Sequence, residues 1–90
     1  MKTESLFEVG KCYFIRTVTY HLVGRVERIG DQQILLKGAS WVADSGRFGE
    51  AIATGKLSEV EYIGGVDVIV NENSICDAME WVHPLPTETI

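Results

Sequence analysis

The sequence predicts a small all-β domain that closes into a barrel. At 90 residues, with 46% hydrophobic and 23% charged residues, the chain has the length and composition of one globular domain, residues 1–90. Val, Ile and Thr contribute 24 residues against eleven Ala and Leu, which favours strands over helices. Nine glycines can supply the turns between short strands. Closure is expected because it removes exposed strand edges.

Alternation of apolar and polar residues predicts five short strands in a meander. In the first of them, Tyr13, Ile15 and Thr17 share one face. Gly24 in the middle of the second predicts a bulge or a sharp bend, since a strand glycine otherwise weakens pairing. The expected strands are residues 12–18, 20–29, 34–43, 57–63 and 66–70.

The connections follow from their turn-forming residues. Gly30-Asp31-Gln32-Gln33 predicts a tight turn, and Gly64-Gly65 predicts a hairpin. Residues 44–56 are expected to form the longest loop, with a short turn of helix, and a short N-terminal helix is allowed. Residues 75–82 are ambiguous: the apolar spacing suits a helix, but the run is short and follows the turn 71–74, so we interpret it as a strand.

Charge is unevenly placed along the chain, whose net charge is −5. Residues 1–56 hold all eight Lys and Arg and six acids, whereas residues 57–90 hold seven acids and no base. A broad basic surface for duplex DNA is therefore not expected. Any nucleic-acid site must be local and built largely by the first half.

No motif of enzyme chemistry stands in the sequence. The run from Gly49 to Leu57 fails as a phosphate loop, because five residues separate its glycines and Leu57 replaces the hydroxyl residue that holds Mg²⁺. His21 and His83 lack metal-ligand spacing, and Glu59 with Glu61 suits a solvated strand face. We predict a protein that is not an enzyme and takes no cofactor or metal.

The cysteines and the N-terminus indicate a cytoplasmic protein. Cys12 and Cys76 lie far apart in apolar stretches and are expected to be buried free thiols, which suits a reducing compartment. The polar start of the chain predicts no signal peptide, and no apolar run approaches the roughly 18 residues of a membrane span.

Residues 6–42 resemble the first motif of the Sm and Sm-like proteins. Leu6 to Lys11 leads into an apolar strand, Leu22-x-Gly24-x-Val26 follows, and Asp31 precedes the apolar residues 34–36. Val68 to Ile75 is similar to the skeleton of the second motif, with Asn71-Glu72 at the Arg-Gly position. The sequence is also similar to Sm-like proteins associated with marine phage. The resemblance implies a five-stranded Sm-like (SH3-like) barrel.

The resemblance further implies a homo-oligomeric ring of roughly five to seven copies, joined by strand edges, that binds single-stranded nucleic acid, most readily RNA. Ser45 to Gly49 adds a guanidinium and an aromatic ring suited to an unstacked base. The alternative is a structural or protein-interaction ring, such as a phage assembly component, without nucleic acid. The predicted nucleic-acid-binding residues are Asp31, Gln32, Gln33, Asn71, Asn73, Arg47 and Phe48.

Overall fold

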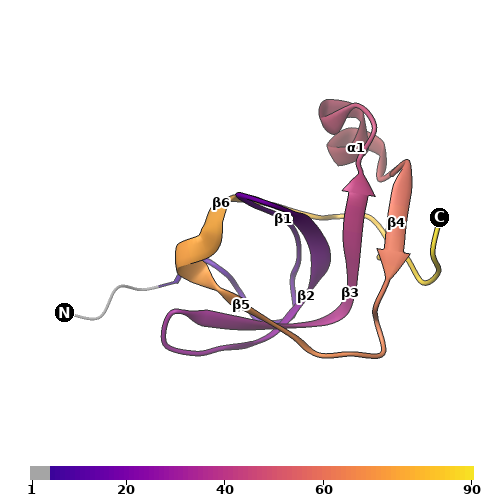
Figure 1. The fold of residues 1–90 in the computed structure, drawn as a ribbon. Coiled ribbons are helices and arrows are strands. Elements are labelled where there is room, and N and C mark those ends of the chain that lie inside the picture. The colour runs from indigo at the N-terminus through magenta and orange to yellow at the C-terminus, as the bar shows by residue number, and fades with distance from the viewer. Residues whose placement is uncertain (1–4) are drawn as a thin grey trace.

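The computed structural model describes residues 5–90 and shows a small, mostly β fold (Figure 1). One antiparallel sheet of six strands has the order β4-β3-β2-β1-β6, and β5 pairs with β3 beside this path. The hydrogen-bonded sheet is not closed, because β4 and β6 form its two ends. The elements are β1 (Cys12–Thr17), β2 (His21–Ile29), β3 (Gln33–Asp44), α1 (Phe48–Thr54), β4 (Glu59–Tyr62), β5 (Val68–Asn71), the 3-10 helix η1 (Glu72–Ser74) and β6 (Ile75–Glu80).

Most of the predicted elements are present. The ambiguous segment forms a strand, β6, which confirms its interpretation as a strand and gives the sheet six strands, one more than the expected barrel has. The Gly64-Gly65 turn exists, but β4 and β5 do not pair as a hairpin; both pair with β3. The reason is the length of β3, because its first residues pair with β5 and its last residues pair with β4. Residues 5–11 contain no helix, and positions 1–4 of the allowed N-terminal helix lie outside the described residues.

The strand β3 is the centre of the sheet. One edge of β3 pairs with β2 over most of its length. The other edge pairs first with β5, from Gln33 to Leu36, and then with β4, from Ser40 to Asp44. Every other strand except β1 and β6 therefore takes its position from β3.

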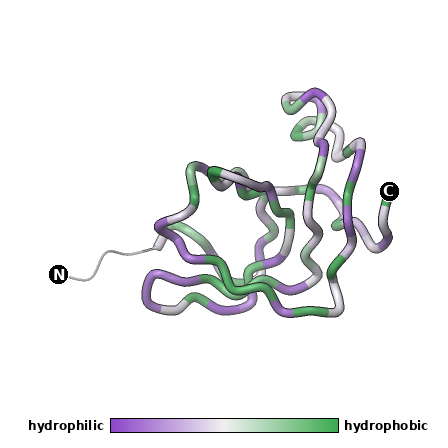
Figure 2. The backbone as a smooth tube through the Cα atoms, viewed as in Figure 1, coloured by the Kyte–Doolittle hydropathy of each residue, from purple (hydrophilic) through white to green (hydrophobic). Residues whose placement is uncertain are grey.

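Two apolar clusters lie on opposite faces of the sheet. Successive side chains of β1 point to opposite faces, so Tyr13 and Ile15 belong to one cluster and Phe14 belongs to the other. The first cluster takes side chains from β1, β2, β3 and β5, and partly buried ones from β6. The second lies under α1 and the C-terminal segment, with Ala51, Leu57 and Trp81 as its buried contributions from outside the strands. Figure 2 shows the apolar stretches along the strands and hydrophilic residues at the β2–β3 turn.

The loop after β3 holds the helix that the sequence allowed there. α1 ends at Gly55, whose left-handed backbone (φ 79°) donates its N–H to the carbonyl of Ala51. This is the usual glycine stop of a helix. Phe48 and Ile52 of α1 pack against the second cluster, so the helix covers one face of the sheet.

The outer edge of β4 is paired by the end of the chain. Val60 and Ile90 exchange two backbone hydrogen bonds, of 3.2 and 2.9 Å, and the Tyr62 N–H donates to the hydroxyl of Thr89. A strand edge covered in this way is closed to another chain. Within residues 5–90, β5 and β6 each retain one edge that pairs with no strand.

Gly24 is required by the close approach of β2 to β3. The β2–β3 register shifts between Val23 and Arg25, which confirms the predicted bulge. A Cβ atom at position 24 would lie 3.2 Å from both the Cα and the Cβ of Ala39 and 3.4 Å from the Cβ of Leu36. The Cα and Cβ of buried Ala39 cannot rotate away as a flexible side chain would, so a side chain at position 24 would force the two strands apart.

Replacing Gly24 by Val is expected to lower the free energy of unfolding by at least about 1–3 kcal/mol, the usual cost of overpacking. The matched control is Gly65→Ala, because position 65 has no atom within 4 Å and no left-handed backbone. Urea unfolding followed by circular dichroism measures both variants. Equal stability of Gly24→Val and the wild type would contradict this role of the glycine.

Candidate nucleic-acid interface

The fold brings together the two turns that the sequence singled out. Gln33 at the start of β3 is the register partner of Asn71 at the end of β5. The Glu72 N–H donates to the backbone carbonyl of Gln32 over 2.9 Å, and the Asn73 side-chain amide donates to Gln32 Oε1 over 3.3 Å. The β2–β3 turn and η1 thus form one continuous surface, here called the two-turn surface, made of residues 30–33 and 71–74.

The two-turn surface offers amides and acids rather than cations. Asp31, Gln32, Gln33, Asn71 and Asn73 are all exposed. Amide side chains present both donors and acceptors, which suits the edges of unpaired bases. Asp31 and Glu72 add negative charge, and the sequence has no Lys or Arg within residues 30–33 or 71–74. A ligand here would be held by hydrogen bonds, not by charge.

Local hydrogen bonds fix the shape of η1. Asn71 Oδ1 accepts from the Asn73 N–H over 2.9 Å and so caps the short helix. The Ser74 hydroxyl donates to the carbonyl of Asn71. Asn71 is therefore engaged in shaping the turn, whereas the amide of Asn73 reaches across to the other turn.

Gln32 is held in a conformation that side chains rarely adopt. Its φ of 61° is left-handed, and it is the one non-glycine residue with positive φ among residues 5–90. For an L-residue this conformation costs about 1–2 kcal/mol. Strain of this kind persists where surrounding structure imposes it, and it gathers at functional sites.

Arg47 and Phe48 lie elsewhere, at the start of α1. The Phe48 ring packs edge-on against Phe14, with centroids 5.5 Å apart, and the Arg16 guanidinium lies over the ring at 4.4 Å. Phe48 therefore anchors the helix, and the guanidinium of Arg16 covers part of its ring. Arg47 is exposed and lines a pocket with Lys56. Lys56 was missed in the sequence because nothing in its spacing links it to Arg47.

The contact of Arg16 with Asp77 joins β1 to β6. The guanidinium donates to both carboxylate oxygens, with Nε to Oδ1 at 2.7 Å. This hydrogen bonding lowers the pKa of Asp77 below its ordinary value of 3.8. Both side chains are partly exposed, so the pair contributes modestly to stability.

Comparison of the chain with protein-family models, with curated proteins and with solved structures found no match. Among residues 5–90 there is no group of three or more His, Cys, Asp or Glu that could hold a metal ion. Cys12 and Cys76 are both free thiols, but Cys12 is only half-buried and Cys76 is exposed, so the expected burial of Cys76 is wrong. None of the helices in the described part is long and apolar enough to span a membrane.

The Arg16–Asp77 pair should make stability depend on pH in the acid range. Folding lowers the pKa of Asp77. The contribution of the ion pair to the free energy of unfolding is therefore complete above pH 3.8 and is lost as the pH falls through the lower pKa of the folded state. Asp77→Asn should therefore have a lower urea midpoint than the wild type at neutral pH, and the difference should shrink on acidification. A difference that stays constant with pH would contradict the assignment.

Gln32→Gly should raise the free energy of unfolding by up to about 1 kcal/mol, since glycine removes the left-handed strain but adds unfolded-chain entropy. The matched control, Gln33→Gly, places the same substitution in β3 and should lower it by about 0.5–1 kcal/mol. Urea unfolding of both variants measures the contrast. Destabilisation of similar size at both positions would show that Gln32 is not strained.

Proposed function

We propose that this chain is an Sm-like protein, not an enzyme, that forms a homo-oligomeric ring and binds single-stranded RNA at the two-turn surface. The observation that carries the proposal is the contact between Gln32 and Asn73, which unites two turns 41 residues apart in sequence. These are the turns on which the resemblance places recognition of a base. Amides on a surface without cations favour hydrogen bonding to bases over capture of phosphates.

Three features of the fold support the Sm-like assignment. The apolar-x-Gly-x-apolar segment lies in β2 with its bulge at Gly24. The segment from Val68 to Ile75 forms β5, η1 and the first residue of β6. The first apolar cluster collects side chains from β1, β2, β3, β5 and β6, as the interior of a barrel would. We therefore propose that the curled sheet is a small Sm-like (SH3-like) barrel.

The unpaired edges of β5 and β6 support the ring. Because the end of the chain covers the edge of β4, pairing with neighbouring copies would join β5 of one copy to β6 of the next. Ile69 on β5 is 66% exposed, and a neighbouring copy paired with this edge would cover it. A ring also repeats a weak site around its axis, and multiple weak contacts add affinity.

A second candidate function is a structural or protein-interaction ring without nucleic acid. The acids Asp31 and Glu72 on the two-turn surface favour it, because they repel phosphates. The ring would then be the same and the two-turn surface would contact protein. Binding experiments separate the two functions.

Light scattering should find a closed assembly of roughly five to seven copies at micromolar concentration. Ile69→Lys should shift it toward the monomer, because a charge at an edge strand opposes pairing. Val18→Lys places the same charge on an exposed apolar residue after β1, off the unpaired edges, and should leave the ring intact. A wild-type monomer at high micromolar concentration would rule out the ring.

Labelled oligouridine should bind the ring at low salt with a shallow salt dependence, since few cations are available. Gln33→Ala and Asn73→Ala should each weaken binding by about two- to tenfold, the loss of one hydrogen bond of about 0.5–1.5 kcal/mol. Fluorescence anisotropy at two salt concentrations measures this, with light scattering confirming intact rings. Absence of binding to any single strand by an intact ring would favour the structural function.

A further inference from the structure

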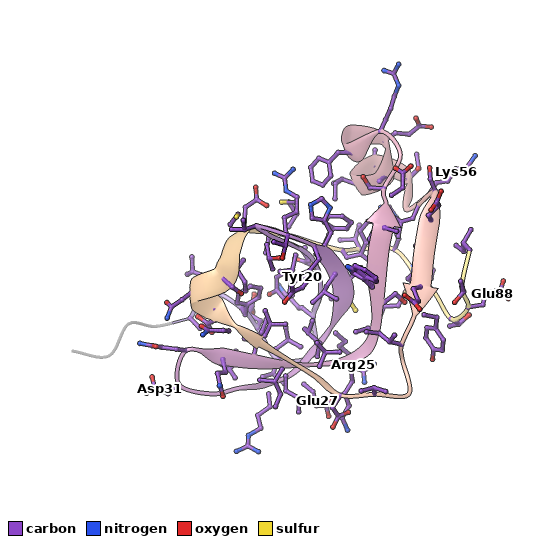
Figure 3. The ribbon with its side chains drawn as sticks, viewed as in Figure 1. Tyr20, Arg25, Glu27, Asp31, Lys56 and Glu88 are labelled. Atoms are coloured by element: carbon purple, nitrogen blue, oxygen red, sulfur yellow. The ribbon has the colours of Figure 1, made fainter. Side chains whose placement is uncertain are left out.

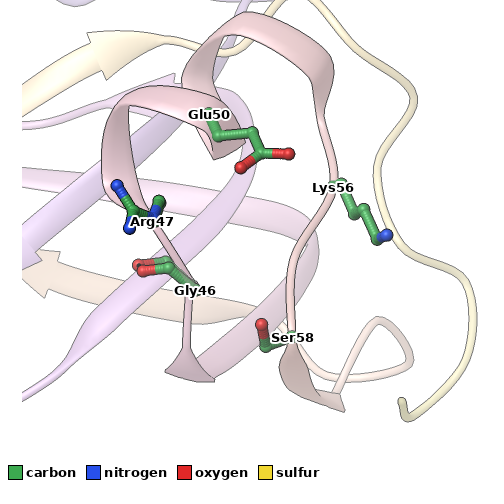
Figure 4. A pocket seen from close by; sticks show the side chains of 6 residues that line it. Gly46, Arg47, Glu50, Lys56 and Ser58 are labelled. Atoms are coloured by element: carbon green, nitrogen blue, oxygen red, sulfur yellow. Dashed lines mark hydrogen bonds between the residues drawn. The ribbon is translucent and has the colours of Figure 1, made fainter.

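A small polar pocket lies at the far side of the molecule from the two-turn surface. It is bounded by the end of β3, by α1 and by the segment that leads into β4, and its volume is 180 Å³ (Figure 4). The Glu50 carboxylate and the Ser58 hydroxyl point into the space between α1 and this segment in Figure 4. The lining residues are Ser45, Gly46, Arg47, Glu50, Lys56 and Ser58.

The floor of the pocket is fixed by Asp44 and Gly46. The Gly46 N–H donates to Asp44 Oδ1 over 2.7 Å, and the Ser58 N–H donates to the carbonyl of Asp44 over 3.1 Å. Gly46 is left-handed, with φ 73°, and a Cβ there would lie 2.7 Å from the Ser58 hydroxyl oxygen. Glycine at this position therefore leaves room for the hydroxyl.

The charges around the pocket do not neutralise one another. In Figure 4, Arg47 and Lys56 lie on opposite sides of the space, and the Lys56 side chain extends away from α1. The ion pairs found within residues 5–90 involve Lys11, Arg16 and Arg25, so neither pocket cation pairs with Glu50. Two of the eight cations in an acidic chain thus line one pocket, beside a carboxylate left free to accept a hydrogen bond.

Two cations beside one carboxylate favour a ligand that has both a negative charge and a hydrogen-bond donor. Guanidinium and ammonium groups bind phosphate oxygens by charge-assisted hydrogen bonds. A carboxylate repels phosphate, and a hydroxyl or an amine on the ligand offsets this repulsion by donating a hydrogen bond to the carboxylate. The volume is below the about 300–1,000 Å³ of a pocket for a whole small molecule, so it suits one sugar-phosphate unit better than a complete nucleotide.

We propose that this pocket binds one ribose-phosphate unit of single-stranded RNA, with Arg47 and Lys56 on the phosphate and Glu50 accepting the 2′-hydroxyl. The inference rests on the proposed function and deepens it: the two-turn surface contacts bases, and the pocket distinguishes RNA from DNA. The 2′-hydroxyl is the group by which a protein tells the two apart. The Ser58 hydroxyl supplies a further donor to the phosphate.

The pocket and the two-turn surface can be tested separately. Figure 3 shows Asp31 and Lys56 at opposite ends of the molecule. Effects of substitutions at distant sites without shared partners multiply as fold-changes in affinity. Substitutions at the pocket should therefore act equally in the wild type and in the Asn73→Ala variant.

The experiment compares labelled oligouridine with oligodeoxyuridine of equal length, which differ only in the 2′-hydroxyl, by fluorescence anisotropy over a salt series. Arg47→Ala and Lys56→Ala should weaken binding of both strands, each reducing the slope of log affinity against log salt by about 0.7. Lys37→Ala is the matched control, because it removes a cation that does not line the pocket. Circular dichroism verifies that each variant is folded.

Glu50→Ala gives the sharpest result, because the two strands should respond in opposite directions. RNA affinity should fall about threefold or more, since a hydrogen bond to a carboxylate is lost, and DNA affinity should rise as repulsion is removed. An increase for both strands would overturn the role of Glu50. Wild-type affinity in the Arg47 and Lys56 variants, with loss in Asn73→Ala, would overturn the pocket alone. Failure of the wild type to bind either strand would overturn the proposed function as well.

Discussion

The close approach of β2 to β3 at Gly24 and Ala39 is the constraint on which the rest of the structure depends. With no side chain at Gly24, β2 can shift its register against β3 and bend without separating from it. The bend lets β2 hold β1 on its other edge while β3 extends past it to receive both β5 and β4. A side chain at this point would push β2 and β3 apart and would open the first apolar cluster.

Two cores on one sheet explain how a 90-residue chain becomes stable. A domain of this size buries only about 60% of its unfolded surface, so a single-sided sheet would be marginal. Here β1 is buried on both faces, with Ile15 in one cluster and Phe14 in the other. The second cluster exists because α1 and Trp81 cover the outer face, and the Arg16 guanidinium over Phe48 ties the helix to β1. The segment after β3, with α1, is therefore part of the fold as well as a wall of the pocket.

The distribution of charge divides the surface into two kinds of site. The two-turn surface has amides and acids, whereas the pocket beside α1 has two cations and one acid. An acidic protein cannot hold a nucleic acid by a general field, because its net charge of −5 repels the phosphates. Localised cations and hydrogen bonds to bases are the remaining means of attraction. The proposed division of labour between the two surfaces follows from that restriction.

The sequence alone determined the strands, the bulge at Gly24 and the two turns, because alternation and turn-forming residues are local properties of the chain. It also placed a short helical turn in residues 44–56. Tertiary structure decided that β4 and β5 both pair with β3, since Gly64-Gly65 specifies a turn but not the partners of its strands. It likewise decided that Gln32 contacts Asn73 and that Lys56 lines the same pocket as Arg47. A single sequence does not show which of its distant residues lie close together in space. Phe48 shows the same limit: the sequence offers an aromatic ring, and only the tertiary structure shows that the ring packs against Phe14 and Arg16.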